Sequence, residues 1–151
     1  MTEAKLPSNL PQWMKDHADL YLRSGGKEGH MYKVPTGAKP VSSLLLITTG
    51  RKSGEKWMFP LFYGKAGNGY FVIASKGGAP EHPGWYRNMQ AHPEVEIQVG
   101  TKKMKARART ATGDERKRLW DQAVSFYPPY ADYEKKAGAR EIPVVVLDPV
   151  H

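Results

Sequence analysis

Residues 44–54 read LLLITTGRKSG, an apolar β-type run that leads directly into a turn with two adjacent cations, a hydroxyl and flanking glycines. Glycine lets backbone amides come close to a ligand, and Arg51, Lys52 and the Ser53 hydroxyl add further donors. The pattern predicts two strands, 41–49 and 56–63, joined by a turn that could hold a phosphate or a carboxylate. A solvated basic hairpin tip would read the same way.

Outward from this hairpin the chain is mainly β, with short helices. The patterns predict helices at 10–22, 83–91 and from a capping box at Thr112 to 126, and a further helical piece after Pro128-Pro129. They predict strands at 70–75 (after an Asn68-Gly69 turn), 95–99, 103–109 and 142–147. Consecutive hairpins favour a mainly antiparallel sheet that closes into a barrel, an α+β fold.

Composition bounds the protein to one domain of ordinary size. The 151 residues carry a formal net charge of +8, so we expect attraction to polyanions or a multiply charged small molecule. Cysteine is absent, which excludes disulfides, thiolate metal sites and cysteine nucleophiles. Neither a signal-peptide core nor a membrane span is visible, so we expect a cytoplasmic protein.

Several common functional motifs are missing. No G-x-G-x-x-G follows a strand and no P-loop is present, which argues against Rossmann dehydrogenases and P-loop nucleotide hydrolases. The five histidines show no metal-ligand spacing, so no metal site is expected. Ser75 and Lys76 are adjacent, and neighbours in an extended chain point to opposite faces, which argues against a Ser-Lys hydrolase.

Two glycine-bearing, donor-rich strand exits, 50–54 and 75–78, could line one cleft with an aromatic cluster made of Trp85, Tyr86, Tyr127, Tyr130 and Tyr133. Such a cleft would suit a flat aromatic ring with an anionic tail. Alternatively, the tyrosines simply close the end of the barrel, and spacing alone favours this structural explanation.

The motifs TGRKSG (49–54), PL (60–61), ASKGG (74–78), PGWYRN (83–88), HP (92–93), YPPY (127–130) and IPVVV (142–146) occur in this order. Their sequence resembles the deazaflavin-dependent nitroreductase family of actinobacteria over about residues 40 to 148. The resemblance implies a split β-barrel at 41–151 that binds the deazaflavin, preceded by an N-terminal helix and loop at 1–40, the two together forming one structural domain. It also implies a reduced 8-hydroxy-5-deazaflavin coenzyme, F420H2, which carries a phosphate and an oligoglutamate tail.

The resemblance assigns roles by matched position. The coenzyme-binding residues would be Arg51, Lys52, Ser53, Ser75, Lys76, Gly77 and Gly78, with Trp85, Tyr86 and Asn88 as wall and support. The substrate side would be Phe62, Tyr127, Tyr130 and Tyr133, with the hydroxyl of Tyr130 or Tyr133 as the catalytic hydrogen-bond or proton donor. Members often carry tyrosine directly after the Pro-Leu of the second strand, whereas this chain has Phe62 there and Tyr63 next.

The implied reaction is hydride transfer from F420H2 to an electrophilic small molecule such as a nitroaromatic, a quinone or an activated double bond. The nearest alternative is an FMN-binding oxidoreductase of the same barrel type. A basic nucleic-acid-binding module using 103–109 is a further alternative, but Glu94 and Glu96 on the neighbouring strand and the lack of a recognition motif argue against it. We expect a monomer or weak homodimer, with peripheral membrane contact through Trp13, Leu20 and Tyr21 left open.

Overall fold

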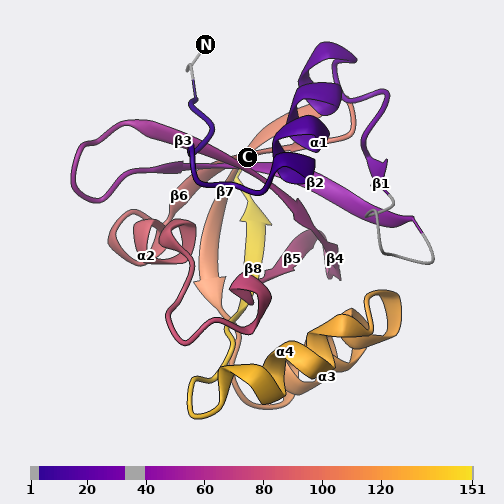
Figure 1. Ribbon diagram of the computed structural model, residues 1–151, viewed down its shortest axis with the longest axis vertical. Helices are drawn as coiled ribbons and strands as arrows, with labels where there is room; N and C mark the ends of the chain where they lie inside the picture. Colours follow the sequence, from indigo (N-terminus) through magenta and orange to yellow (C-terminus); the bar gives the residue numbers. More distant parts are fainter. Residues whose placement is uncertain (1–3, 33–39, 151) are drawn as a thin grey trace.

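The computed structural model describes residues 4–32 and 40–150 of the chain (Figure 1). Helices and strands follow in the order α1 (Gln12–Arg23), β1 (Met31–Tyr32), β2 (Val41–Thr49), β3 (Lys56–Phe62), β4 (Gly64–Ala66), β5 (Gly69–Ile73), the 3₁₀ turn η1 (Lys76–Gly78), α2 (Gly84–Ala91), β6 (Glu94–Val99), β7 (Lys102–Thr110), α3 (Gly113–Phe126), α4 (Pro129–Ala137) and β8 (Val144–Pro149). All the longer predicted strands and helices are confirmed, with ends shifted by one or two residues.

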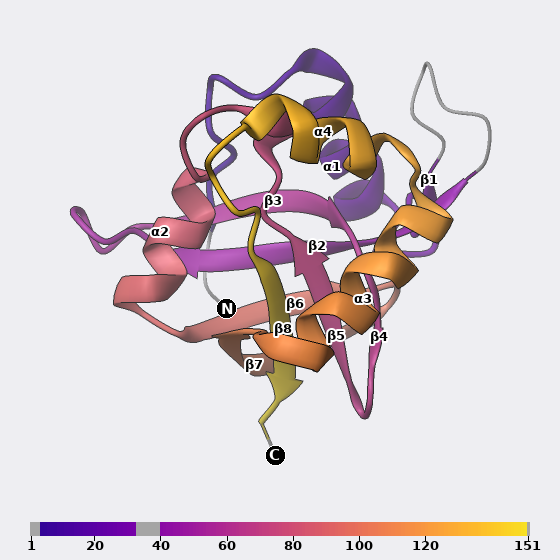
Figure 2. The same ribbon diagram turned by 90° about the horizontal axis from the view of Figure 1, so that it is seen from below.

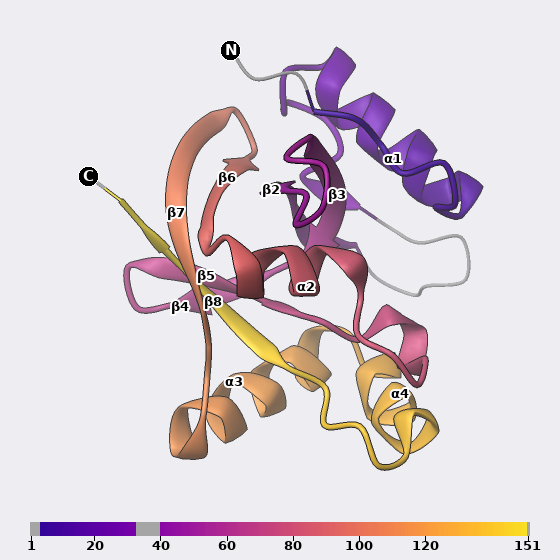
Figure 3. The same ribbon diagram turned by 90° about the vertical axis from the view of Figure 1, so that its left-hand side faces the viewer.

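The strands form one curled antiparallel sheet. Its order is β1-β2-β6-β7-β8-β5-β4, and β3 pairs with the opposite edge of β2. Figure 3 shows α1 and the α3/α4 pair at opposite ends of the molecule, with α2 between them. The predicted α+β class with a mainly antiparallel, barrel-like sheet and short peripheral helices is confirmed.

Strand β2 is apolar along consecutive residues because both of its faces are buried. Leu44 and Leu46 point into the barrel, where they pack in one cluster with Ile97 of β6. Leu45 points the other way and packs with Met58 against α1. A strand with alternating polar and apolar residues would expose one face to solvent. Each fully buried leucine side chain contributes about 2 kcal/mol to folding stability. The leucine run therefore specifies a central strand covered on both sides.

Helices α3 and α4 cover the outer face of β5 and β8 (Figure 2). Phe71 and Ile73 of β5 and Val144 and Val146 of β8 supply the sheet side of this layer. The continuous valine run of β8 has the same cause as the leucine run of β2, because Val145 and Leu147 face the barrel interior. This layer places the tyrosines of α4 beside the ends of β5 and β3.

The N-terminal segment is anchored to the sheet. The Lys5 amide donates to the Lys56 carbonyl oxygen at 3.0 Å, and the Met58 amide donates to the Lys5 carbonyl oxygen at 2.9 Å. The buried Tyr21 hydroxyl of α1 donates to the Ser43 carbonyl oxygen at 3.0 Å and accepts from the Gly100 amide at 2.6 Å, and burial raises its pKa to about 12. Tyr21 is fully buried, so it is not available for the peripheral membrane contact that was left open for this helix.

Two local predictions were wrong, and two short strands were missed. The short strands β1 and β4 carry too few residues to show a period and were not predicted. The hairpin turn is centred on Gly67-Asn68, with positive φ at Gly67, because Ala66 pairs with Gly69. The predicted capping box at Thr112 does not form. The Thr112 side chain makes no capping hydrogen bond, and Glu115 accepts two hydrogen bonds from Arg109 at 2.7 and 3.0 Å.

Candidate functional site

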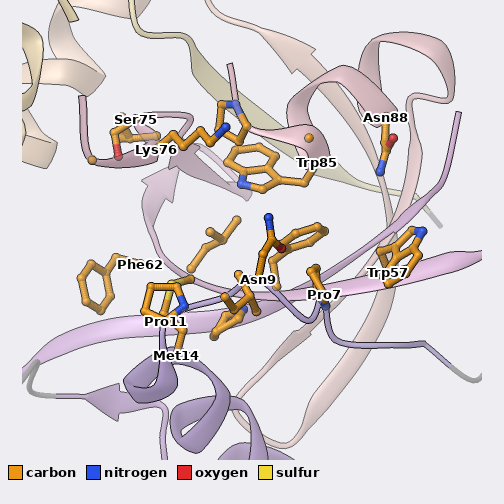
Figure 4. Close-up of a pocket in the computed structure, with 18 of the residues that line it drawn as sticks. Pro7, Asn9, Pro11, Met14, Trp57, Phe62, Ser75, Lys76, Trp85 and Asn88 are labelled. Carbon is orange, nitrogen blue, oxygen red and sulfur yellow. The ribbon is translucent and has the colours of Figure 1, made fainter. Parts of the chain in front are cut away.

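One large cleft, of about 770 Å³, lies between β3, the turn after β2, the loop after β5, the start of α2, α4 and residues 7–14. Figure 4 shows Ser75, Lys76 and Trp85 on one side of this cleft, facing Phe62, Pro11 and Met14 on the other. Lys52 in one donor-rich turn and Gly77 in the other both line the cleft, although they are 25 positions apart in sequence. Folding has therefore brought both turns to a single cavity with the aromatic residues.

The turn after β2 is held by a buried amide from α2. The Asn88 side-chain oxygen accepts hydrogen bonds from Arg51 Nη1 at 2.8 Å and from the Arg51 backbone amide at 3.2 Å. Its Nδ2 donates to the buried Thr48 hydroxyl at 3.2 Å. Asn88 therefore sets the position of the Arg51 guanidinium at the cleft wall, while neighbouring Lys52 is exposed and makes no ion pair within the described ranges.

The loop after β5 has an unusual backbone. Lys76, Gly77 and Gly78 have φ values of 47°, 61° and 83°, so three consecutive residues occupy the left-handed region. Ser75, Lys76 and Gly77 line the cleft, and Lys76 Nζ lies 2.9 Å from Glu81 Oε1 in an exposed ion pair. This ion pair holds the pKa of Glu81 below its ordinary value.

Two residues predicted for the coenzyme site lie outside the cleft lining. A Cβ on Gly78 would lie 2.8 Å from the Tyr133 carbonyl oxygen, so this glycine serves close packing against α4. Tyr86 is buried, and its hydroxyl lies 2.7 Å from Thr110 Oγ1, on the side of α2 away from the cleft. Trp85, one residue earlier on α2, does line the cleft.

Three tyrosines from the end of α3 and from α4 lie together at one end of the cleft. The rings of Tyr127 and Tyr130 are 4.9 Å apart, and the hydroxyls of Tyr127 and Tyr133 are 3.4 Å apart. Burial raises the pKa of both Tyr127 and Tyr130 above the ordinary value. The hydroxyls of Tyr127 and Tyr130 therefore stay protonated at neutral pH and can act as hydrogen-bond donors.

Phe62 lines the cleft with its ring 5.0 Å from that of Tyr127. Its neighbour Tyr63 points to the other face of β3, where its hydroxyl lies 2.7 Å from His30 Nε2. Strand alternation therefore keeps the Tyr63 hydroxyl out of the cleft that Phe62 lines.

The N-terminal segment supplies a wall that local sequence patterns did not indicate. Its cleft-lining residues, together with those of β3 that were not predicted, are Pro7, Ser8, Asn9, Leu10, Pro11, Trp13, Met14, His17, Trp57, Phe59, Pro60 and Leu61. Figure 4 shows the Asn9 side chain directed into the cleft. No motif marks the N-terminal residues of this wall, because their proximity to the cleft arises from the pairing of Lys5 with β3.

The cleft has a polar, cationic part and an apolar, aromatic part. Arg51, Lys52, Ser53 and Lys76 gather around the two turns, whereas Trp85, Phe62 and the tyrosines provide aromatic surface. This donor set fits a ligand that combines a phosphate or carboxylates with a flat ring, because guanidinium and ammonium groups bind the anions and aromatic faces bind the ring.

Comparison with known proteins identifies the chain. The model of the F420H(2)-dependent quinone reductase family matches residues 13–149. The chain belongs to this family. An F420H(2)-dependent quinone reductase of Mycobacterium tuberculosis (strain H37Rv) is 40% identical over 140 residues, which cover 90% of this chain and 89% of the relative.

Solved structures confirm the split-barrel fold of the family. An F420-H2 dependent reductase, FDR-A, is 41% identical with a TM-score of 0.65, covering 79% of this chain and 98% of its own. A structure described as a domain-swapped dimer is 38% identical with a TM-score of 0.67, and the match covers 91% of this chain and 98% of that one.

Membership of this family confirms the predicted resemblance and the prediction of an F420H2-dependent oxidoreductase. It favours the deazaflavin coenzyme over the FMN alternative. Among the described helices, none has the length and apolar character that crossing a membrane requires. The roles of individual site residues stay predictions.

Proposed function

We propose that this chain transfers a hydride from F420H2 to a quinone bound in the cleft between β3, α2 and α4. The observation that carries the proposal is the convergence of the two cationic turns and the tyrosine cluster on one cavity of about 770 Å³. The family description and the M. tuberculosis relative support the choice of coenzyme and of substrate class.

Arg51, Lys52, Ser53 and Lys76 would hold the phosphate and acidic tail of the coenzyme. Arg51 is already oriented by Asn88, which lowers the entropy that binding must remove. Lys76 is paired with the exposed Glu81, so an incoming anion competes only with a solvent-screened contact. Ser75 and Gly77 line the cleft beside Lys76, where small side chains leave room for the ring.

Trp85 and Phe62 would form the apolar walls around the ring and the quinone. Trp85 is 4% exposed, which makes it a rigid surface. Phe62 packs against Tyr127 and adds no hydroxyl, so the acceptor carbonyl must find its donor elsewhere. The tyrosines at the end of α3 and on α4 line the same cleft, and the Tyr127 ring lies 5.0 Å from that of Phe62, so their hydroxyls are the donors we assign to the acceptor carbonyl.

Bound F420H2 supplies the hydride, and conversion of a quinone to a quinol needs one proton in addition. Tyr130 and Tyr133 both line the cleft, and burial raises the pKa of Tyr130 above its ordinary value. Either hydroxyl can donate a hydrogen bond or the proton to the quinone oxygen. Residues 7–14 form one wall of the cleft, and we assign to this wall a role in limiting the access of water to the reacting groups.

The proposal also includes a cytoplasmic protein that is a monomer or a weak homodimer. A domain-swapped dimer among the 38%-identical structures shows that a related chain can exchange an element between copies. Light scattering over a range of protein concentrations measures the oligomeric state directly, and a stable dimer at the lowest concentration contradicts this part.

Titration with oxidised F420, followed by its fluorescence, tests the coenzyme assignment. Oxidation of F420H2 is then measured with a quinone, a nitroaromatic and an unsaturated lactone as acceptors. We expect saturable coenzyme binding and the highest kcat/KM with the quinone. Absence of binding overturns the proposal, and tight binding without turnover of any acceptor indicates a carrier of the coenzyme instead.

A further inference from the structure

One guanidinium group, that of Arg140, holds the loop that carries Lys76 from behind. Its Nη2 donates to the Ser75 carbonyl oxygen at 2.7 Å, its Nη1 to the Ala74 carbonyl oxygen at 3.1 Å, and its Nε to the Ala79 carbonyl oxygen at 2.9 Å. These carbonyls lie on both sides of residues 76–78, so a single side chain clamps the two ends of the loop. Arg140 does not line the cleft.

The loop needs such a clamp because its backbone is strained. Within residues 4–32 and 40–150, Lys76 is the only residue other than glycine with a positive φ. The loop's own hydrogen bonds run from the Gly78 amide to the Ser75 carbonyl oxygen at 2.9 Å and from the Ala79 amide to the Lys76 carbonyl oxygen at 3.1 Å. Two bonds of a short turn do not by themselves fix three consecutive left-handed residues.

His82 completes the clamp. Its Nδ1 lies 3.0 Å from Arg140 Nη1, and because a guanidinium has only donors, Nδ1 must be the acceptor. The Arg140 backbone amide donates to the Ala137 carbonyl oxygen at the end of α4 at 3.2 Å. Arg140 and His82 thus join the Lys76 loop, the residues before α2 and the C-terminal end of α4.

We infer that Arg140 is the positioning residue that holds Ser75, Lys76 and Gly77 in the geometry in which they bind the anionic coenzyme. This inference rests on the proposed function for the identity of the ligand. Its structural part, the ordering of the loop by a planar fork of donors, does not depend on the ligand. Lysine cannot replace that fork, because an ammonium group presents its donors from one atom.

The test compares wild type with Arg140→Met, Arg140→Lys and Arg118→Met. Arg118 is exposed on α3 outside the cleft lining and makes a matched control for loss of one positive charge. We expect amide hydrogen exchange across 75–79 in coenzyme-free protein to be faster in Arg140→Met by about tenfold, with a smaller increase in Arg140→Lys and none in Arg118→Met.

Coenzyme affinity is measured on the same proteins at low and high salt. We expect Kd for oxidised F420 to rise by about tenfold in Arg140→Met at both salt concentrations, because a positioning effect is not screened as a long-range attraction is. Combining Arg140→Met with Lys76→Ala should cost less than the sum of the single changes.

Unchanged loop exchange in Arg140→Met overturns the inference, and so does full retention of affinity in Arg140→Lys or loss of the affinity difference at high salt. If Arg140→Met does not fold, exchange and affinity in Arg140→Lys decide the question alone. Failure of wild type to bind F420 overturns the proposed function, whereas the exchange comparison still tests the clamp.

Discussion

The Cα of Gly78 lies so close to α4 that a Cβ built on it would stand 2.8 Å from the Tyr133 carbonyl oxygen and 2.9 Å from Lys136 Cβ. The loop that carries Lys76 and the helix that carries the tyrosines therefore touch backbone to backbone. Because of this contact, the expected coenzyme side and the expected substrate side of the cleft form one packed unit.

Gly78→Ala should destabilise the protein by about 2 kcal/mol, because the methyl group meets α4 backbone and the φ of 83° is unfavourable for alanine. Gly77→Ala is the matched control, since a Cβ there meets nothing within 4 Å and only the φ of 61° penalises it. Urea unfolding of both variants measures the difference. Equal stability losses contradict the close-packing role of Gly78.

Asn88→Ala should weaken coenzyme binding although Asn88 bonds chiefly to protein groups. The change removes the oxygen that accepts two hydrogen bonds from Arg51. It also removes the Nδ2 donor of the buried Thr48 hydroxyl, and leaving that hydroxyl without this donor costs about 1 to 3 kcal/mol of stability. Gln90→Ala on the exposed side of α2 is the control. Titration with oxidised F420 that shows equal Kd values for Asn88→Ala and wild type would contradict this positioning role.

Lys52→Ala should raise the Kd for F420 by about fivefold at low salt and by less at high salt, because Lys52 is exposed and acts through screened attraction. Lys103→Ala removes the same charge from β7, outside the cleft. Fluorescence titrations at two salt concentrations separate the two positions. A loss of affinity in Lys103→Ala equal to that in Lys52→Ala means that net charge, and not the turn, attracts the coenzyme.

The sequence predicted the fold wherever a pattern was long enough to show its period. Alternation along β7 gave both the strand and its charged face, and the runs at 44–47 and 144–147 marked strands with two buried faces. Two- and three-residue strands carry no such pattern. The capping box predicted at Thr112 does not form for another reason. Glu115 accepts a hydrogen bond from Arg109 of β7, and the position of Arg109 depends on the sheet.

The lining of the candidate cleft was predictable where motifs and resemblance marked single turns, at 51–53 and 75–77. The cleft-lining role of Pro7–Met14 was not, because it depends on the pairing of Lys5 with β3 across about fifty residues. Tyr86 was expected at the cleft because it adjoins Trp85 in a motif, but consecutive residues of a helix point about 100° apart, and Tyr86 does not line the cleft. Arg140 carries no motif of its own, and only the fold reveals its three carbonyl contacts.

Folding stability should decline as the pH falls below 6.5, in part through His17. Burial lowers the pKa of this histidine from the ordinary value of 6.5, and Nε2 lies 2.8 Å from the Gly29 carbonyl oxygen. The unfolded chain therefore takes up the proton first, so stability present above pH 6.5 is lost as the pH falls through the folded-state pKa. Urea unfolding at several pH values measures this effect. The free energy of unfolding of His17→Gln should decline less steeply with falling pH than that of wild type. His92→Gln changes an exposed histidine and is the control, so its free energy of unfolding should decline as steeply as that of wild type.

Tyr133→Phe and Tyr130→Phe should lower kcat for quinone reduction by about tenfold or more and leave the Kd for F420 nearly unchanged. Tyr130 is 5% exposed, whereas Tyr133 is half-buried with its hydroxyl near that of Tyr127, so we expect the larger loss in Tyr133→Phe. Tyr63→Phe is the control, because its hydroxyl lies on the other face of β3. Single-turnover oxidation of bound F420H2 isolates the chemical step from product release. If both α4 variants transfer hydride at the wild-type rate, the proton for the quinone oxygen comes from water admitted past residues 7–14, and the tyrosines serve only to shape the cleft.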